Sequence, residues 1–177
     1  VSRNGWGRLT RLLSTGNLRA RKGDCILELD DLLDYCDDLL LIAMEGDEAL
    51  LHTLKRARPK SVWLAATMPQ SGGDARRLAA LQRLSTATNV PLLATNDALY
   101  ATTAQRPLHD IVTCIREGVT IQKAGKLLRA NAERYLKTPA AMARLFADCP
   151  EALGETGRLI AQIDFTLDDL KYEYPHE

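Results

Sequence analysis

Residues 62–67, Val-Trp-Leu-Ala-Ala-Thr, form a continuous apolar run, as expected for a strand that is buried on both faces. Two further runs share this design: Leu-Leu-Leu-Ile-Ala-Met at 39–44 and Pro-Leu-Leu-Ala-Thr at 91–95. The first two runs are each followed by an amphipathic helical pattern, over 46–57 and 74–88. Strands that alternate with helices at this spacing pair in parallel, so the sequence predicts an α/β fold.

Two helices are predicted before the first strand. Residues 6–13 carry apolar side chains at helical spacing, and the turn-forming sequence Thr15-Gly16-Asn17 is expected to end this helix. Residues 29–35, Leu-Asp-Asp-Leu-Leu-Asp-Tyr, predict a short helix. Its acidic residues lie at the positively polarised end of the helix, where they are stabilising.

Downstream of Tyr100 only helices are predicted. Residues 106–117 form an amphipathic pattern with a proline near its start, and Gly118 follows as an expected C-terminal cap. Pro139 and Pro150 each open a further helix, and these two helices are expected to form a hairpin.

Residues 119–131 separate the strand-containing part from this hairpin. Basic residues cluster there and the apolar periodicity weakens, so this segment is predicted to be a linker. Residues 1–118 then form a partial α/β domain, and residues 132–177 form a helical extension. The polar, acidic sequence at 171–177 is expected to connect to a further part of a longer chain.

The composition is that of an ordinary globular protein, with 46% hydrophobic and 26% charged residues. Lys and Arg number 23, as do Asp and Glu, so the formal charge is zero and no global field attracts nucleic acid. The four cysteines form no Cys-x-x-Cys pair, which favours reduced, packed cysteines in a cytoplasmic protein. No apolar run approaches the roughly 20 residues of a membrane span, so no membrane contact is expected.

A local basic cluster near the N-terminus is the candidate for contact with DNA or with another domain. It comprises Arg8, Arg11, Arg19, Arg21 and Lys22. Five cations close together can contact a phosphate backbone. The alternative, a solvated charged face, remains open.

The carboxyl ends of the predicted strands are where a parallel α/β fold gathers functional groups. Only Glu45, Asn96 and Asp97 supply oxygen ligands there, and no histidine falls at any strand end. The chain also lacks the two glycine-rich motifs, GxGxxG and GxxxxGK[ST], that hold nucleotide phosphates. Glu45 and Asp97 are therefore the candidate metal ligands, as remnants of a site rather than as a complete one.

The segment around Asp97 carries a resemblance to a known family. Residues 90–100, Val-Pro-Leu-Leu-Ala-Thr-Asn-Asp-Ala-Leu-Tyr, resemble the fourth motif of the PHP (polymerase and histidinol phosphatase) domain in bacterial DnaE-type DNA polymerases. The similarity continues through 106–118, 131–137 and 142–153, and Leu170–Pro175 resembles the connection from this domain to the polymerase palm. Residues 5–16, followed by Lys22-Gly23-Asp24-Cys25, are similar to the error-prone branch of the family.

The resemblance implies an incomplete parallel β/α barrel-like domain, followed by the helical hairpin extension that leads toward the palm. The family's Asp-x-His motif stands here as Asp97-Ala98-Leu99, and Thr67-Met68 occupies a position where relatives often carry histidine. Leucine cannot coordinate a metal, so we expect a structural, metal-free module with no catalytic residue and no cofactor. Magnesium-dependent polymerisation is expected in the palm, beyond this chain.

The resemblance also implies the partners and the alternatives. The expected partners are the remaining polymerase domains and, for the parent enzyme, DNA during translesion synthesis, damage-induced mutagenesis and repair. A partial barrel exposes a sheet edge, so self-association is also expected. One alternative is a metal-dependent phosphoesterase or proofreading 3′–5′ exonuclease that uses Asp97 and Glu45, and another is an independent α/β binding protein.

Overall fold

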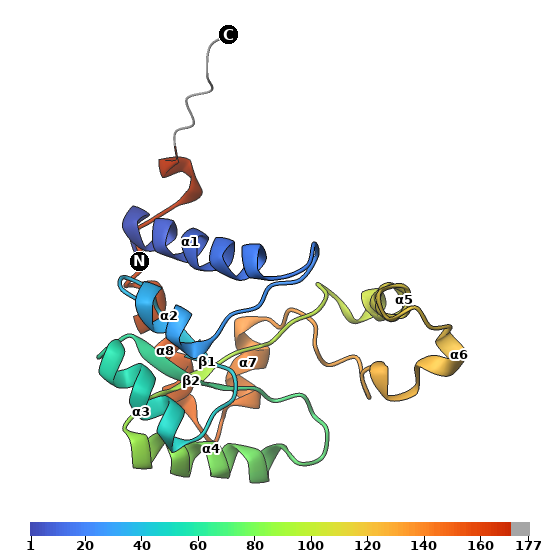
Figure 1. The fold of residues 1–177 in the computed structure, drawn as a ribbon. Coiled ribbons are helices and arrows are strands. Elements are labelled where there is room, and N and C mark those ends of the chain that lie inside the picture. Colours follow the sequence, from blue (N-terminus) through green and yellow to red (C-terminus); the bar gives the residue numbers. More distant parts are fainter. Residues whose placement is uncertain (171–177) are drawn as a thin grey trace.

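The computed structural model describes residues 1–170, whose arrangement is drawn in Figure 1. The helices are α1 (Arg3–Arg19), α2 (Leu29–Tyr35), α3 (Glu48–Ala57), α4 (Asp74–Thr88), α5 (Arg106–Glu117), α6 (Ile121–Ala124), α7 (Pro139–Leu145) and α8 (Pro150–Ile160), and the strands are β1 (Leu41–Ala43), β2 (Val62–Ala66) and β3 (Leu92–Ala94). The predicted connecting tail at 171–177 lies outside the described residues, as does most of Leu170–Pro175.

The three predicted strands form one parallel sheet in the order β1-β2-β3, which confirms the α/β prediction. Leu41 pairs with Val62, and Leu64 pairs with Leu92. Every residue of the central strand β2 is buried, as its continuous apolar sequence requires. Within residues 1–170 these strands make an open sheet, and the barrel-like arrangement stays a prediction.

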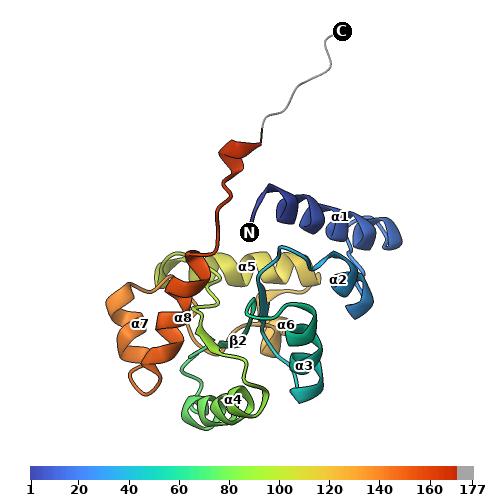
Figure 2. The same ribbon diagram turned by 90° about the vertical axis from the view of Figure 1, so that its left-hand side faces the viewer.

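The C-terminal helices α7 and α8 share a core with the sheet. Leu64 of β2 and Leu51 of α3 belong to the same fully buried cluster as Phe146, Cys149 and Ala152. Figure 2 shows α7 and α8 side by side, and α8 packs along β3. The predicted hairpin is therefore present, and it completes the core of the α/β part. The division into domains stays a prediction, although residues 119–131 contain the short helix α6.

Helix α1 is longer than its sequence indicated. The expected turn at Thr15-Gly16-Asn17 does not form, and the helix continues to Arg19. Gly16 is buried, and a Cβ atom at this position would lie 2.6 Å from Cys25 Sγ. The backbone of Ile26 donates to the Gly16 carbonyl at 3.1 Å. Gly16 thus allows residues 25–27 to lie against the helix, and the prediction that it breaks the helix is wrong.

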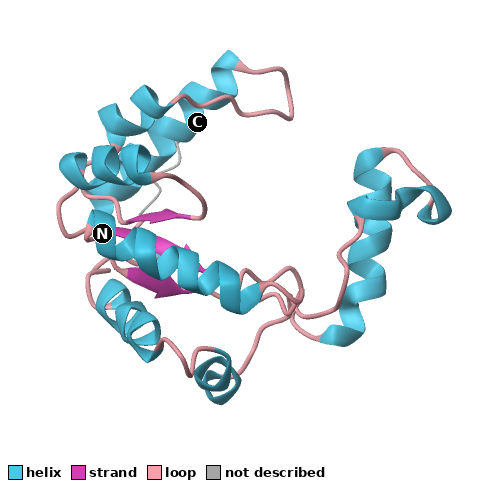
Figure 3. Ribbon diagram, turned by 90° about the horizontal axis from the view of Figure 1, so that it is seen from below, coloured by secondary structure: helices cyan, strands magenta, loops and turns pink. Residues whose placement is uncertain are grey.

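Helices α5 and α6 form a lobe that stands to one side of the sheet (Figures 1 and 3). Helix α5 has the predicted bounds, and Gly118 caps it with a φ of 64°, in the left-handed region that glycine adopts without strain. Arg106 at its start donates to the carbonyl of Arg129, which closes the lobe.

All four cysteines are free, as predicted, but the prediction that they are packed is wrong for Cys25, which is exposed. Cys36 and Cys149 are buried, and burial raises the pKa of both thiols. Among the described helices none is long and apolar enough to cross a membrane.

Candidate functional site at the carboxyl edge of the sheet

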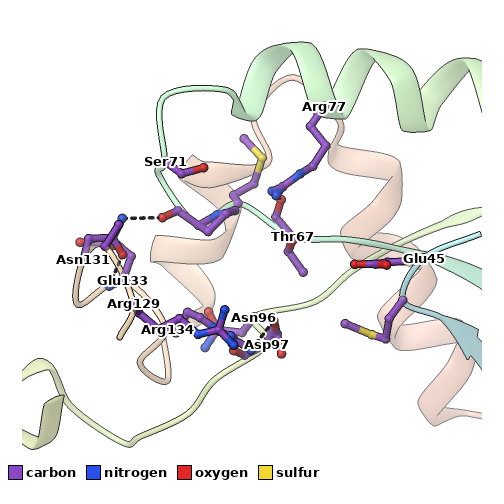
Figure 4. Close-up of a pocket in the computed structure, with 14 residues that line it drawn as sticks. Glu45, Thr67, Ser71, Arg77, Asn96, Asp97, Arg129, Asn131, Glu133 and Arg134 are labelled. Atoms are coloured by element: carbon purple, nitrogen blue, oxygen red, sulfur yellow. Dashed lines mark hydrogen bonds and ion pairs between the residues drawn. The ribbon is translucent and has the colours of Figure 1, made fainter. Parts of the chain in front are cut away.

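A cavity of about 530 Å³ lies at the carboxyl edge of the sheet. Glu45 follows β1, Thr67 follows β2, and Asn96 and Asp97 follow β3, and all four line it (Figure 4). The candidate residues Glu45 and Asp97 are thus brought to one cavity, because parallel strands present their carboxyl ends on the same side. Their role as metal ligands stays a prediction.

The opposite wall of this cavity comes from the segment 129–134, which lies far along the chain. Asn131 Nδ2 donates to the carbonyls of Pro69 at 2.8 Å and Gln70 at 3.1 Å. Asn96 Nδ2 donates in turn to the carbonyl of Tyr135 at 2.5 Å. Two side-chain amides therefore tie the later segment to the loops that follow β2 and β3.

Arg134 is the cation that neutralises Asp97. Its Nη2 lies 2.5 Å from Asp97 Oδ2, and its Nε donates to the Asp97 carbonyl at 2.8 Å. The Arg134 side chain is only 15% exposed. The backbone reinforces this contact, because Leu99 N donates to the Arg134 carbonyl at 2.7 Å. A charge-assisted, two-point contact of this kind holds both groups in place.

Two other charged side chains at the cavity also have partners. Arg77 donates to the carbonyl of Thr67 and lies 3.5 Å from Asp74 Oδ1. Glu133 lies 3.5 Å from Lys137 Nζ. Cations and carboxylates therefore lie close together at the cavity, so it has no strong field of one sign.

Potential metal-ligand side chains do not cluster at this edge in the described part of the chain. Within residues 1–170 no three His, Cys, Asp or Glu side chains gather closely enough to hold an ion. A catalytic zinc site ordinarily has three protein ligands. Glu45 and Asp97 supply two carboxylates, one of which binds Arg134, and Leu99 supplies no donor atom.

Sequence reasoning identified Asp97 but missed Arg134 and Asn131. The available signal was the polar stretch at 131–137, which the family resemblance covers. The local pattern of this stretch does not indicate which strand end it contacts. Arg134 and Asp97, which form the contact, lie 37 residues apart in the sequence.

The structure divides the predicted basic cluster. Arg19 forms two hydrogen bonds with Asp31, at 2.6 and 2.8 Å, which lower the pKa of that carboxyl to about 2. Arg8 lies 3.5 Å from Asp37. The remaining three members are exposed, on α1 and in the loop after it: Arg11, Arg21 and Lys22. Contact of this cluster with DNA or another domain stays a prediction.

Comparison with known proteins identifies relatives along the whole chain, although no family model matches it. It is 47% identical over 184 residues to "Error-prone DNA polymerase 1" of Rhizobium meliloti (strain 1021). It is 48% identical over 187 residues to "Error-prone DNA polymerase" of Bradyrhizobium diazoefficiens. Each alignment covers 99% of this chain. The chain spans only 16% of the length of these curated relatives. Rhodopseudomonas palustris (strain BisB5) has an error-prone DNA polymerase that is 47% identical over the full chain. The predicted resemblance to the error-prone branch is thereby confirmed, while assignment to the PHP domain stays a prediction. Over nearly its entire length, this chain is similar to one part of the error-prone DNA polymerases.

Proposed function

We propose that residues 1–177 form a structural PHP module within an error-prone DNA polymerase. The observation that carries this proposal is the similarity at 47–48% identity over 99% of the chain to proteins named error-prone DNA polymerase. The polymerisation reaction, with its magnesium ions, belongs to a palm elsewhere in the polypeptide. The parent enzyme acts in the cytoplasm on damaged DNA, in translesion synthesis and mutagenic repair.

The geometry of the carboxyl edge favours a structural role over a catalytic one. Asp97 is the best-placed ligand candidate, and its carboxylate binds the guanidinium of Arg134, whose side chain is largely buried. The Asn96 amide connects the same two segments, and the Asn131 amide ties the later segment to the loop after β2. The polar groups at this edge therefore act as cross-links that hold the segment 129–137 against the sheet. Such a cross-linked module gives the remaining polymerase domains, the expected partners, a rigid surface to pack on.

The alternative of a phosphoesterase or 3′–5′ exonuclease is tested with the same residues in the complete polymerase. We expect Asp97→Asn and Glu45→Gln to retain primer extension within about threefold of the parent, since neither side chain contacts the reacting atoms in this proposal. Primer extension past a template lesion, measured alongside extension on undamaged template, checks the error-prone activity itself.

The decisive measurement is cleavage of a primer with a mismatched 3′ end in the presence of manganese or zinc. We expect no cleavage that depends on Asp97 or Glu45. Metal-dependent cleavage that is lost in Asp97→Asn, together with a stoichiometric metal in the purified enzyme, would support the exonuclease instead. Arg134→Gln serves as the matched control: in the structural proposal it lowers stability, and it gives the enzyme no nuclease activity.

A further inference from the structure

Helix α5 presents an apolar stripe to solvent. Leu108, Ile111, Val112 and Ile115 are 61, 52, 55 and 74% exposed. Their spacing of three, one and three residues places them on one face of the helix. An amphipathic helix of a globular protein normally turns such a face toward a core, so this face lacks its packing partner within residues 1–170.

The stripe is continuous with neighbouring apolar surface on the same lobe. Ile121 and Leu127 follow α5 and are about half exposed. A cavity of about 410 Å³ lies between Ile115 and Ile121. The opposite side of the helix is already packed, since Thr113 and Cys114 are buried. Because Ile111, Ile115 and Ile121 border one hollow, the stripe and Ile121 form one patch.

We propose that this stripe is covered by an amphipathic helix of the same polymerase polypeptide that lies outside residues 1–177. The inference rests on the proposed function, because that function supplies the rest of the polypeptide. The relatives are about six times as long as this chain, which spans 16% of their length, so ample sequence exists to provide the helix.

A segment of the same polypeptide covers the stripe more readily than a second copy of the chain does. The covalent connection raises the effective concentration of such a segment at the stripe, whereas a second copy must associate from solution.

Charge around the stripe indicates the chemistry of the covering helix. Lys123 and Lys126 are exposed on the adjoining segment, and Arg116 flanks the stripe on α5 itself, where Glu117 pairs with it at 2.9 Å. A helix with an apolar face bordered by Asp or Glu complements this surface. An apolar face bordered by Lys or Arg does not.

Cysteine labelling in the complete polymerase tests the proposal. Ile115→Cys lies on the stripe, and Leu18→Cys on α1 is the matched control, because Leu18 is 88% exposed and outside the lobe. Each variant is labelled with a maleimide in the native state and again in urea, and peptide mass spectrometry separates the new cysteine from Cys25. We expect native labelling of Ile115→Cys to be at least tenfold slower than in urea, and Leu18→Cys to label nearly as fast in both.

Three outcomes decide between the occupants. Native labelling of Ile115→Cys as fast as in urea would overturn the proposal. Protection that disappears on dilution would identify a second copy and also overturn it. Protection that is independent of concentration, and that is lost when Ile111→Glu is added, supports it. Primer extension is measured on the same samples: an inactive but stripe-protected enzyme contradicts the proposed function, whereas an active enzyme with an unprotected stripe contradicts only this inference.

Discussion

Helices α4 and α5 were predicted with their observed bounds, and both are amphipathic, yet only α4 has its apolar face packed within the described residues. Leu78 of α4 is buried, and Leu81 and Leu84 pack against the core of the sheet. On α5, all four residues of the apolar stripe are exposed.

This difference shows what local sequence pattern does and does not determine. An apolar period of 3.6 residues fixes that a helix forms and which of its faces is apolar. The partner of that face is set by contacts between distant residues. For α4 the partner is the neighbouring sheet, with strands β2 and β3 immediately before and after it in the chain. Helix α5 comes after the last strand and has no such neighbour.

Truncating one side chain in each region gives the largest expected contrast. Phe146 is fully buried between the sheet and the α7–α8 hairpin, so Phe146→Ala should lower the free energy of unfolding by about 3–5 kcal/mol. Ile111→Ala should change it by less than about 0.5 kcal/mol, because half of that side chain is already in water. Urea titration of residues 1–177, followed by circular dichroism at 222 nm, measures both.

Two results would break the comparison between the regions. An Ile111→Ala cost above 2 kcal/mol would mean that the α5 stripe is packed within the isolated chain. A small Phe146→Ala cost would mean that the α7–α8 hairpin is not part of the sheet's core, in favour of the predicted division at residues 119–131.

Helix α1 sharpens the comparison, because one of its glycines is packed and another is not. A Cβ at Gly16 would lie 2.6 Å from Cys25 Sγ, whereas a Cβ at Gly7 meets nothing within 4 Å. We expect Gly16→Ala to destabilise the chain by about 1–3 kcal/mol through overpacking. Gly7→Ala should stabilise it by about 0.5–1 kcal/mol, because alanine is the better helix former. Thermal unfolding of the two variants in parallel checks the signs, and stabilisation by Gly16→Ala would show that residues 25–27 do not lie against α1.

The sequence was most informative about local elements and strand ends. Continuous apolar runs located the three strands, and the strand-end rule located Glu45 and Asp97 at one cavity. It was least informative where one residue type can have two structural roles. Glycine often ends a helix, but Gly16 is buried within α1 and allows residues 25–27 to lie against that helix. Arg134 has no local pattern that distinguishes it from a solvated arginine, since only the folded chain brings it to Asp97.

The ion pair between α1 and α2 provides the smallest expected effect, because it lies at the surface. The hydrogen bond from Arg19, followed by that from the Glu28 backbone, lowers the pKa of Asp31 from 3.8 to about 2. A carboxyl with a depressed pKa in the folded state contributes stability above its unfolded pKa, and this contribution is lost as pH falls through the folded pKa.

We therefore expect Asp31→Asn to lower the melting temperature slightly at pH 5–7, with the difference from wild type shrinking between about pH 4 and pH 2. Asp30→Asn is the control, since Asp30 forms no ion pair within residues 1–170. Equal melting temperatures of wild type and Asp31→Asn at pH 7 would show that the ion pair between Arg19 and Asp31 adds no measurable stability.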